Sequence, residues 1–524
     1  MRKGESLVSA MVRTRNRRRG FGQRRTPIGL IGLLLLASCL GGCAVGPDYR
    51  PPQLTLPNAW SNARSKTVSG PPQLGEWWRQ LNDPMLDQLI VEAVACNLDV
   101  ATAKAKIREA RASYRQTRGT LFPSINGSAS ATPSRTASTT TNGIVTPTST
   151  GSQFQAGFDA SWELDLFGAN SRAVEAAYYG LDAADENLRV TLLTLIGDVA
   201  SSYVEARGYQ ARAALARRTA ASQRQTVALT RTKFAAGATS AVDVANATGQ
   251  AASTEANIPD LEAAYTETVH RLSILTGGPP TALVERLRKA APIPRPGRPM
   301  PIGIPADILL TRPDVRLAEW QYAQYTAHIG QAEAARYPSV SLTGNIATSG
   351  SKIGDLGKNS SIGWSFGPTL TVPIFNGGQL KAAVEIAEAQ RDQSFVAYRS
   401  AVLSALEEVE NALVALAQER LKSGSLTVSV RNYRDAESLA LSLYESGAQS
   451  FLTLLEAQRS LYSAEDSLLR SQIAITTDYI ALNKALGGGW DGHVDASKPV
   501  ITDVNTGPHW VSLDAQLRQL GMRN

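Results

Sequence analysis

Histidine, a common general acid or base and metal ligand, is rare and scattered in this sequence. Its 524 residues include four histidines, and none of them has the spacing of a metal-binding motif: His270, His328, His493 and His509. The sequence also lacks a nucleophile elbow, a Walker loop and a paired catalytic signature. These observations argue against an enzyme, and we expect no catalytic residue, cofactor or metal ion.

Three carboxylates mark a stretch with a different chemistry, in which one side faces water and the other an apolar medium. Asp159, Glu163 and Asp165 alternate with apolar residues between 154 and 167, and successive side chains of a strand point to opposite faces. About ten such residues cross a bilayer when the strand is tilted. The pattern predicts a membrane strand with its carboxylates in a water-filled barrel lumen. The alternative is a half-buried strand of a soluble sandwich.

The same alternation returns at three other places, weakly at 124–131 and more clearly at 339–346 and 361–374. The four strands predict two hairpins, 124–165 and 338–374, each with a polar loop. Aromatic residues flank the strand bases, as in an interfacial girdle: Phe122, Phe167, Tyr337 and Phe375.

The net charge of +7 comes from the N-terminal segment. Residues 1–42 contain nine basic residues and one acidic residue, so the remaining chain carries a net charge of −1. The basic balance therefore gives no support for a nucleic-acid partner.

The N-terminal segment has the pattern of a secretory signal, with basic residues followed by a short apolar run at 28–40. It ends in Leu-Gly-Gly-Cys43, which resembles the lipobox of bacterial lipoproteins. We therefore expect a signal peptide at 1–42, acylation of Cys43 (with Cys39 as the alternative) and a lipid-anchored tether at 43–83. An ordinary signal with incidental cysteines stays open.

Two proline-free runs, 169–236 and 376–446, predict helices on the order of 100 Å long. Each run ends in a similar turn, at 237–240 and 447–450. Shorter helices are expected to follow the turns, at 241–277 and 451–486.

The turns carry helix stop and start signals. Gly237 and Gly447 are suited to ending a helix, and Ser240 and Ser450 to capping the next one. Ser240 with Asp243 approximates a capping box.

The order helix, strand pair, long helix, turn and helix therefore occurs twice. We expect two internal structural repeats, at 84–290 and 306–490, joined by a proline-rich bridge at 291–305 and followed by a C-terminal segment at 491–524.

Four strands cannot close a barrel, and an open sheet edge in lipid leaves backbone groups unpaired. Two copies give eight strands, whose interior fills with side chains. Three copies give twelve strands with room for a channel. The predicted fold class is therefore mainly α with membrane β, as a trimeric 12-stranded barrel continued by a long α-helical coiled-coil barrel.

Several motifs resemble the TolC-like outer-membrane efflux family, and the lipobox points to its NodT-type branch. The motifs are Trp162–Gly168, Arg312–Val315, Tyr337–Leu342, Val372–Gly378 and Leu486–Trp490, and the resemblance extends over nearly the whole mature chain. The resemblance implies a homotrimeric channel-tunnel in the bacterial outer membrane, in contact with its lipid and extending into the periplasm. It implies a passive exit duct for small molecules, fed by an inner-membrane RND pump and a periplasmic adaptor.

The resemblance also implies that the turns form the periplasmic tip that meets the adaptor, at Gly237, Thr239, Ser240, Gly447, Gln449 and Ser450. Asp243 is a gate candidate there, with helix capping as the alternative role. Glu456 and Arg459 fit a solvated helix face better than a gate. Two other functions stay open, namely a protein-secretion duct and a lipid-anchored structural coiled-coil protein.

Overall fold

The computed structural model describes residues 44–61, 74–141, 144–146, 148–297, 312–489, 492 and 494–498. The chain divides into two units, 1–43 and 44–524, and the description concerns the second. The predicted signal peptide, both candidate acylation sites and most of the predicted bridge and C-terminal segment lie outside the described residues.

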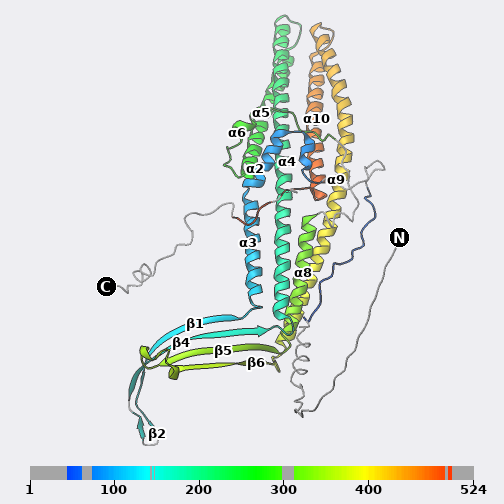
Figure 1. The fold of residues 1–524 in the computed structure, drawn as a ribbon. Coiled ribbons are helices and arrows are strands. Elements are labelled where there is room, and N and C mark those ends of the chain that lie inside the picture. The colour runs from blue at the N-terminus through cyan, green and yellow to red at the C-terminus, as the bar shows by residue number, and fades with distance from the viewer. Residues whose placement is uncertain are drawn as a thin grey trace, which may run out of the picture. The chain divides into compact units, whose positions relative to one another are not determined.

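Four helices form the long part of the molecule (Figure 1). The helices α4 (Ala169–Ala235) and α9 (Gln379–Glu445) each contain 67 residues, and α5 (Ala241–Leu275) and α10 (Phe451–Ala485) each contain 35. Each long helix folds back on its shorter partner through a tight turn. None of the helices in the described part of the chain combines the length and the apolar character needed to span a bilayer.

Two further helices lie beside the sheet-proximal half of the long helices. The helix α3 (Leu98–Gly119) packs on α4, and α8 (Pro313–Ala334) packs between α4 and α9 (Figure 1). The lateral order is therefore α3 with α5, then α4, then α8 with α10, then α9.

The main hydrophobic core lies where the short elements pack against this layer. These elements are η1 (Trp77–Leu81), α2 (Pro84–Cys96) and α6 (Val284–Leu287). Apolar residues of α2 recur at helical spacing and are fully buried, as are the two tryptophans of η1: Trp77, Trp78, Leu86, Leu89 and Ile90.

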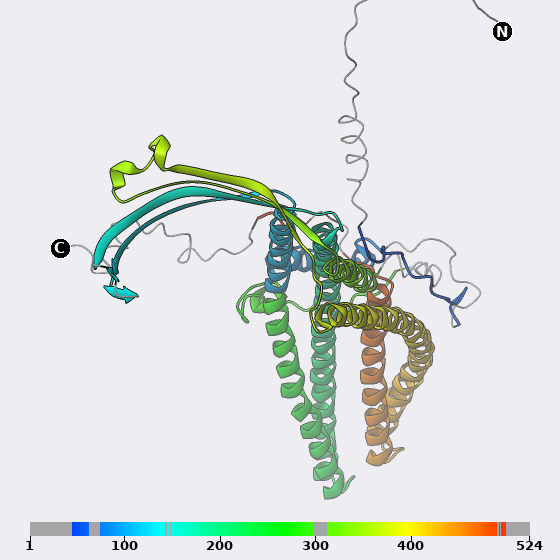
Figure 2. The same cartoon turned by 90° about the horizontal axis from the view of Figure 1, so that it is seen from below.

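A four-stranded antiparallel sheet extends from one end of the helices and curves away from them (Figures 1 and 2). Its strands are β1 (Ser124–Thr136), β4 (Ser149–Leu164), β5 (Ser339–Gly350) and β6 (Ile362–Thr371), in the order β1-β4-β5-β6. The loops carry small elements: β2 (Thr139–Thr141) paired with β3 (Ile144–Thr146), and the turns η3 (Ile353–Asp355) and η4 (Asn359–Ser361).

The last strand is shorter than its sequence pattern predicts. The alternation continues to residue 374, but β6 ends at Thr371. Pro373 has no backbone N–H to donate to a neighbouring strand, so the ladder stops before it. Gly377 and Gly378 then take positive φ angles of 59° and 87°, and α9 begins after them at Gln379 instead of at residue 376.

Candidate functional site: the strand faces and the helical tips

The register of the sheet gathers polar residues on one face. Asp159 of β4 lies opposite Asn126 of β1 and Asn345 of β5, and Asn345 lies opposite Ser365 of β6. Glu163 is opposite Ser341 on the same face. The predicted carboxylates Asp159 and Glu163 therefore share one polar surface.

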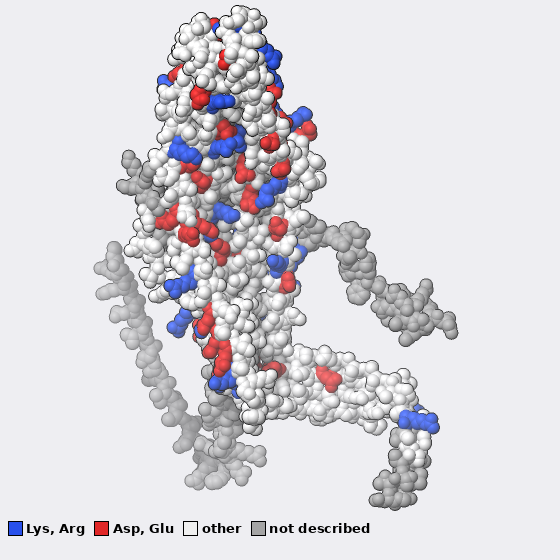
Figure 3. Space-filling model, turned by 180° about the vertical axis from the view of Figure 1, so that it is seen from behind, with Lys and Arg blue, Asp and Glu red and all other residues white. Residues whose placement is uncertain are grey.

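The other face of the sheet is apolar and uncovered. Phe158 lies opposite Ile346, and Ile346 opposite Trp364, so these side chains form one row across three strands. Trp364 is 76% exposed and Phe366 is 69% exposed. Figure 3 shows how few charged side chains this arm of the molecule carries compared with the helices. An apolar surface of this kind calls for lipid or another apolar cover.

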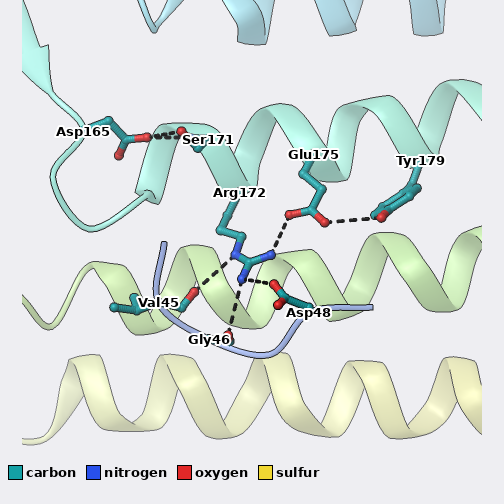
Figure 4. Close-up of polar contacts among 8 residues, drawn as sticks. All are labelled: Val45, Gly46, Asp48, Asp165, Ser171, Arg172, Glu175 and Tyr179. Carbon is teal, nitrogen blue, oxygen red and sulfur yellow. Dashed lines mark hydrogen bonds and ion pairs between the residues drawn. The ribbon is translucent and has the colours of Figure 1, made fainter. Parts of the chain in front are cut away.

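Asp165 does not belong to the polar strand face, which corrects the sequence interpretation. It lies one residue beyond the end of β4. Its carboxylate accepts hydrogen bonds from the Ser171 backbone N–H (2.7 Å) and hydroxyl (2.6 Å; Figure 4). It also accepts one from the backbone N–H of Asn170 (3.1 Å). Asp165 therefore satisfies free donors in the first turn of α4 and favours the helix start electrostatically.

The turn between α4 and α5 is closed by local hydrogen bonds. Gly237 has a φ of 76°, and the Ala238 N–H donates to the Lys233 carbonyl (2.8 Å). Ser240 and Asp243 form the expected capping box.

One carboxylate oxygen of Asp243 receives three of these bonds. Oδ2 accepts from the Thr239 hydroxyl (2.6 Å), the Ser240 N–H (3.1 Å) and the Ser240 hydroxyl (2.9 Å). These bonds, first among them the one from Thr239, lower the pKa of Asp243 below its ordinary value. Helix capping is thus the role that Asp243 has within a single chain.

The turn between α9 and α10 has the same backbone course and a different chemistry. Gly447 has a φ of 81°, and the Ala448 and Gln449 N–H groups share the Leu443 carbonyl (2.9 and 3.2 Å). Ser450 makes no side-chain cap, and its hydroxyl lies 3.3 Å from that of Thr453. The second tip therefore contains no equivalent of the Asp243 carboxylate.

The two helical hairpins contact each other near their tips. The Tyr444 hydroxyl donates to Thr230 Oγ1 (3.1 Å), and both residues are buried. Lys233 Nζ lies 5.0 Å from the Tyr444 ring centroid and donates to the Glu445 carbonyl (3.1 Å). The ring of Tyr444 also packs edge-on against Phe451.

A second set of polar contacts lies further from the tips. Gln458 Nε2 donates to Thr226 Oγ1 (3.1 Å), and the exposed Arg459 donates to Gln250 Oε1 (2.6 Å). Arg459 thus lies on a solvated face, as expected, and also connects α10 to α5. Sequence reasoning missed Tyr444 and Thr230, because residues more than 200 positions apart give no local signal of contact.

The described residues offer no metal centre. No group of three or more His, Cys, Asp or Glu side chains is arranged there to hold an ion. Cys96 is an exposed free thiol.

An amphipathic sheet joined to a stalk of long helical hairpins defines a class of outer-membrane channel proteins. The chain belongs to the outer membrane efflux protein family, whose model matches residues 89–278 and 304–488. The family resemblance of the sequence motifs is therefore confirmed.

Individual relatives cover most of the chain. It is 40% identical over 459 residues to Nodulation protein T of Rhizobium leguminosarum bv. trifolii, covering 86% of this chain and 96% of that protein. It is 33% identical over 467 residues to the solvent efflux pump outer membrane protein SrpC of Pseudomonas putida, again covering 86% and 96%. The solved outer-membrane channel OprN has a TM-score of 0.80 at 32% identity, covering 86% of this chain and all of that one.

Proposed function

We propose that the protein is the outer-membrane channel of a tripartite efflux system and the passive exit duct for small molecules driven by an RND pump. The observation that carries this proposal is the two-faced sheet, apolar on the Trp364 side and polar on the Asp159 side, continuous with the helical hairpins. The named efflux function of SrpC supports it.

We infer that three copies assemble, because the edges of a single chain are incomplete. In the described structure β1 pairs only with β4, and β6 only with β5. The next copy can pair its β1 with this β6 and continue the sheet, which gives twelve strands after three copies. Along α9, at the same lateral edge, apolar side chains are exposed at intervals close to seven or eleven: Ile386, Val396, Leu403, Val414, Leu421, Val428 and Leu439. Such a stripe suits packing against a neighbouring helix.

The duplicated order of elements supports two structural repeats within each chain. Equal lengths of α4 and α9, and of α5 and α10, bring both turns to the far end of the helices (Figure 1). We propose that these turns contact the periplasmic adaptor through Gly237, Thr239, Ser240, Gly447, Gln449 and Ser450. Asp243 contributes to the gate by holding the first turn in shape.

The apolar face of the sheet fits a location in the outer membrane, in contact with its lipid. We further propose that acylation at Cys43, in preference to Cys39, anchors the mature chain there. The lipobox sequence supports this assignment.

Single-channel recording in a planar bilayer, together with the mass of the purified oligomer, tests the proposal. We expect a trimer with discrete conductance steps. Phe366→Lys should abolish insertion, because a cation on a lipid-facing strand costs about 2–4 kcal/mol at the midplane. Ser365→Lys adds the same charge one residue away, on the polar face, and should still insert. A monomer without conductance, or equal insertion of both variants, would refute the channel.

A further inference from the structure

The first described residues of the chain form a structured segment. Residues 44–49, here called the N-terminal strap, run past the start of α4 and along α8 (Figure 4). The Val45 N–H donates to the Phe167 carbonyl (3.1 Å), directly between the end of β4 and the start of α4. The strap therefore lies where the sheet joins the helices.

Arg172 of α4 binds the strap through several atoms (Figure 4). Its Nε donates to the Val45 carbonyl (3.2 Å), and its Nη2 donates to the Gly46 carbonyl (3.3 Å) and the Asp48 carboxylate (2.7 Å). Nη1 pairs with Glu175 (2.7 Å). The Arg172 side chain is only 6% exposed, so a guanidinium with five fixed donors is used almost entirely for protein contacts.

Glycines allow the strap to approach this closely. A Cβ added at Gly46 would lie 2.4 Å from the Gly330 Cα, and one added at Gly330 would lie 2.8 Å from the Arg172 Nε. A Cβ at Gly168 would lie 2.8 Å from the Ala44 Cα. The strap, α8 and the Arg172 side chain are thus in direct contact with no room for another carbon atom.

The far end of the strap is fixed as well. The Tyr49 hydroxyl donates to Glu319 of α8 (2.8 Å). Its ring packs edge-on against Tyr179 of α4 and Tyr322 of α8, each with a centroid distance of 5.8 Å. Contacts at both ends distinguish the strap from a loose tether.

We propose that Arg172 is a positioning residue that fixes the N-terminal strap, the stretch directly after the proposed acylation site, at the junction of sheet and helices. Ala44, the first described residue of the strap, lies against Gly168 at the start of α4, and the proposed acylation site is the residue directly before it in the sequence. This inference rests on the proposed acylation of Cys43. The strap stays in place because the buried Arg172 guanidinium would lose most of its hydrogen-bond acceptors if the strap moved away.

Hydrogen exchange of the purified full-length protein, read by mass spectrometry, tests the inference. In Arg172→Met, peptides covering the strap should exchange at least about tenfold faster, because charge-assisted bonds are lost. The rest of α4 should exchange as in the wild type. Arg212→Met is the matched control, since Arg212 is an ion-paired arginine of the same helix, 2.7 Å from Asp466. It should leave the strap unchanged.

Gly330→Ala provides a second variant that removes no charge. Alanine normally stabilises a helix interior relative to glycine, but here its methyl group should displace Arg172 and speed strap exchange. Any of three results would overturn the inference. These are unprotected strap amides in the wild type, a uniform rise in the exchange rate along α4 in Arg172→Met, or an unchanged exchange rate of the strap in both variants. The intact mass of the protein shows whether the chain is acylated, and the conductance shows whether it forms a channel. Failure of the proposed acylation and failure of the proposed channel are therefore recognised separately from failure of this inference.

Discussion

Asp243 allows a charge-based gate to be distinguished from a helix cap. All three hydrogen bonds that its carboxylate accepts come from Thr239 and Ser240 of its own turn. Asp243→Ala removes these bonds, and loss of a cap costs about 1 kcal/mol. This corresponds to about a fivefold increase in local opening. Asp243→Asn keeps an oxygen acceptor while removing the charge, so it should cost less than Asp243→Ala.

The assay combines hydrogen exchange at residues 239–244 with single-channel recording of the same preparations. We expect Asp243→Ala to exchange about five times faster and to open more often. Asp243→Asn should lie between the wild type and Asp243→Ala in both measurements. If Asn and Ala raise the conductance equally, the negative charge itself closes the tip, and our assignment of a capping role is wrong.

The pH dependence gives an independent check. Because the folded pKa of Asp243 is lowered, folding favours the ionised carboxylate. Its stabilisation is complete above the ordinary pKa of about 3.9 and is lost as the pH falls through the lower folded value. The protection of this turn, taken relative to the intrinsic exchange rate at each pH, should therefore fall in acid in the wild type and change much less in Asp243→Ala.

Two further predictions concern buried tyrosines. Tyr444→Phe deletes the hydroxyl bonded to Thr230 (3.1 Å) and should lower the free energy of separating the hairpins by about 1 kcal/mol. Tyr444→Ala, which also removes the ring, should lower it by about 3–5 kcal/mol; equal destabilisation in denaturant titrations would contradict this. Burial raises the pKa of Tyr203 to about 12, so the neutral phenol is favoured in the folded chain. Unfolding should become easier as the pH rises from about 10 through 12, and alkaline melting curves of Tyr203→Phe should show a smaller loss of stability over this range than the wild type.

Glycine and proline made much of the helical architecture predictable from sequence. The structure ends α4 at Ala235, just before Gly237, and ends α10 at Ala485, just before Gly487. The Ser240–Asp243 capping box could be predicted because both partners lie within four residues. Local signals of this kind need no knowledge of distant parts of the chain.

The strand ends and the contacts between hairpins could not be predicted in the same way. Alternation continues smoothly through Asp165, so the pattern cannot distinguish one more strand residue from the group that caps the next helix. The strap has no periodicity at all. Its position depends on Gly46 meeting Gly330, which lies 284 positions further along the chain.

The two hairpins combine equal lengths with unequal tips, and this combination has a consequence for any partner. Equal helices place both turns at one level, so a cyclic trimer would present six tips in a single ring. The tips would alternate between a turn capped by the Asp243 carboxylate and a turn in which Ser450, Thr453 and Gln449 contact one another through hydroxyl and amide groups. A partner that contacts all six tips therefore meets two kinds of site. The Asp243 variants would alter only one kind, three of the six contacts, and should weaken adaptor binding without abolishing it.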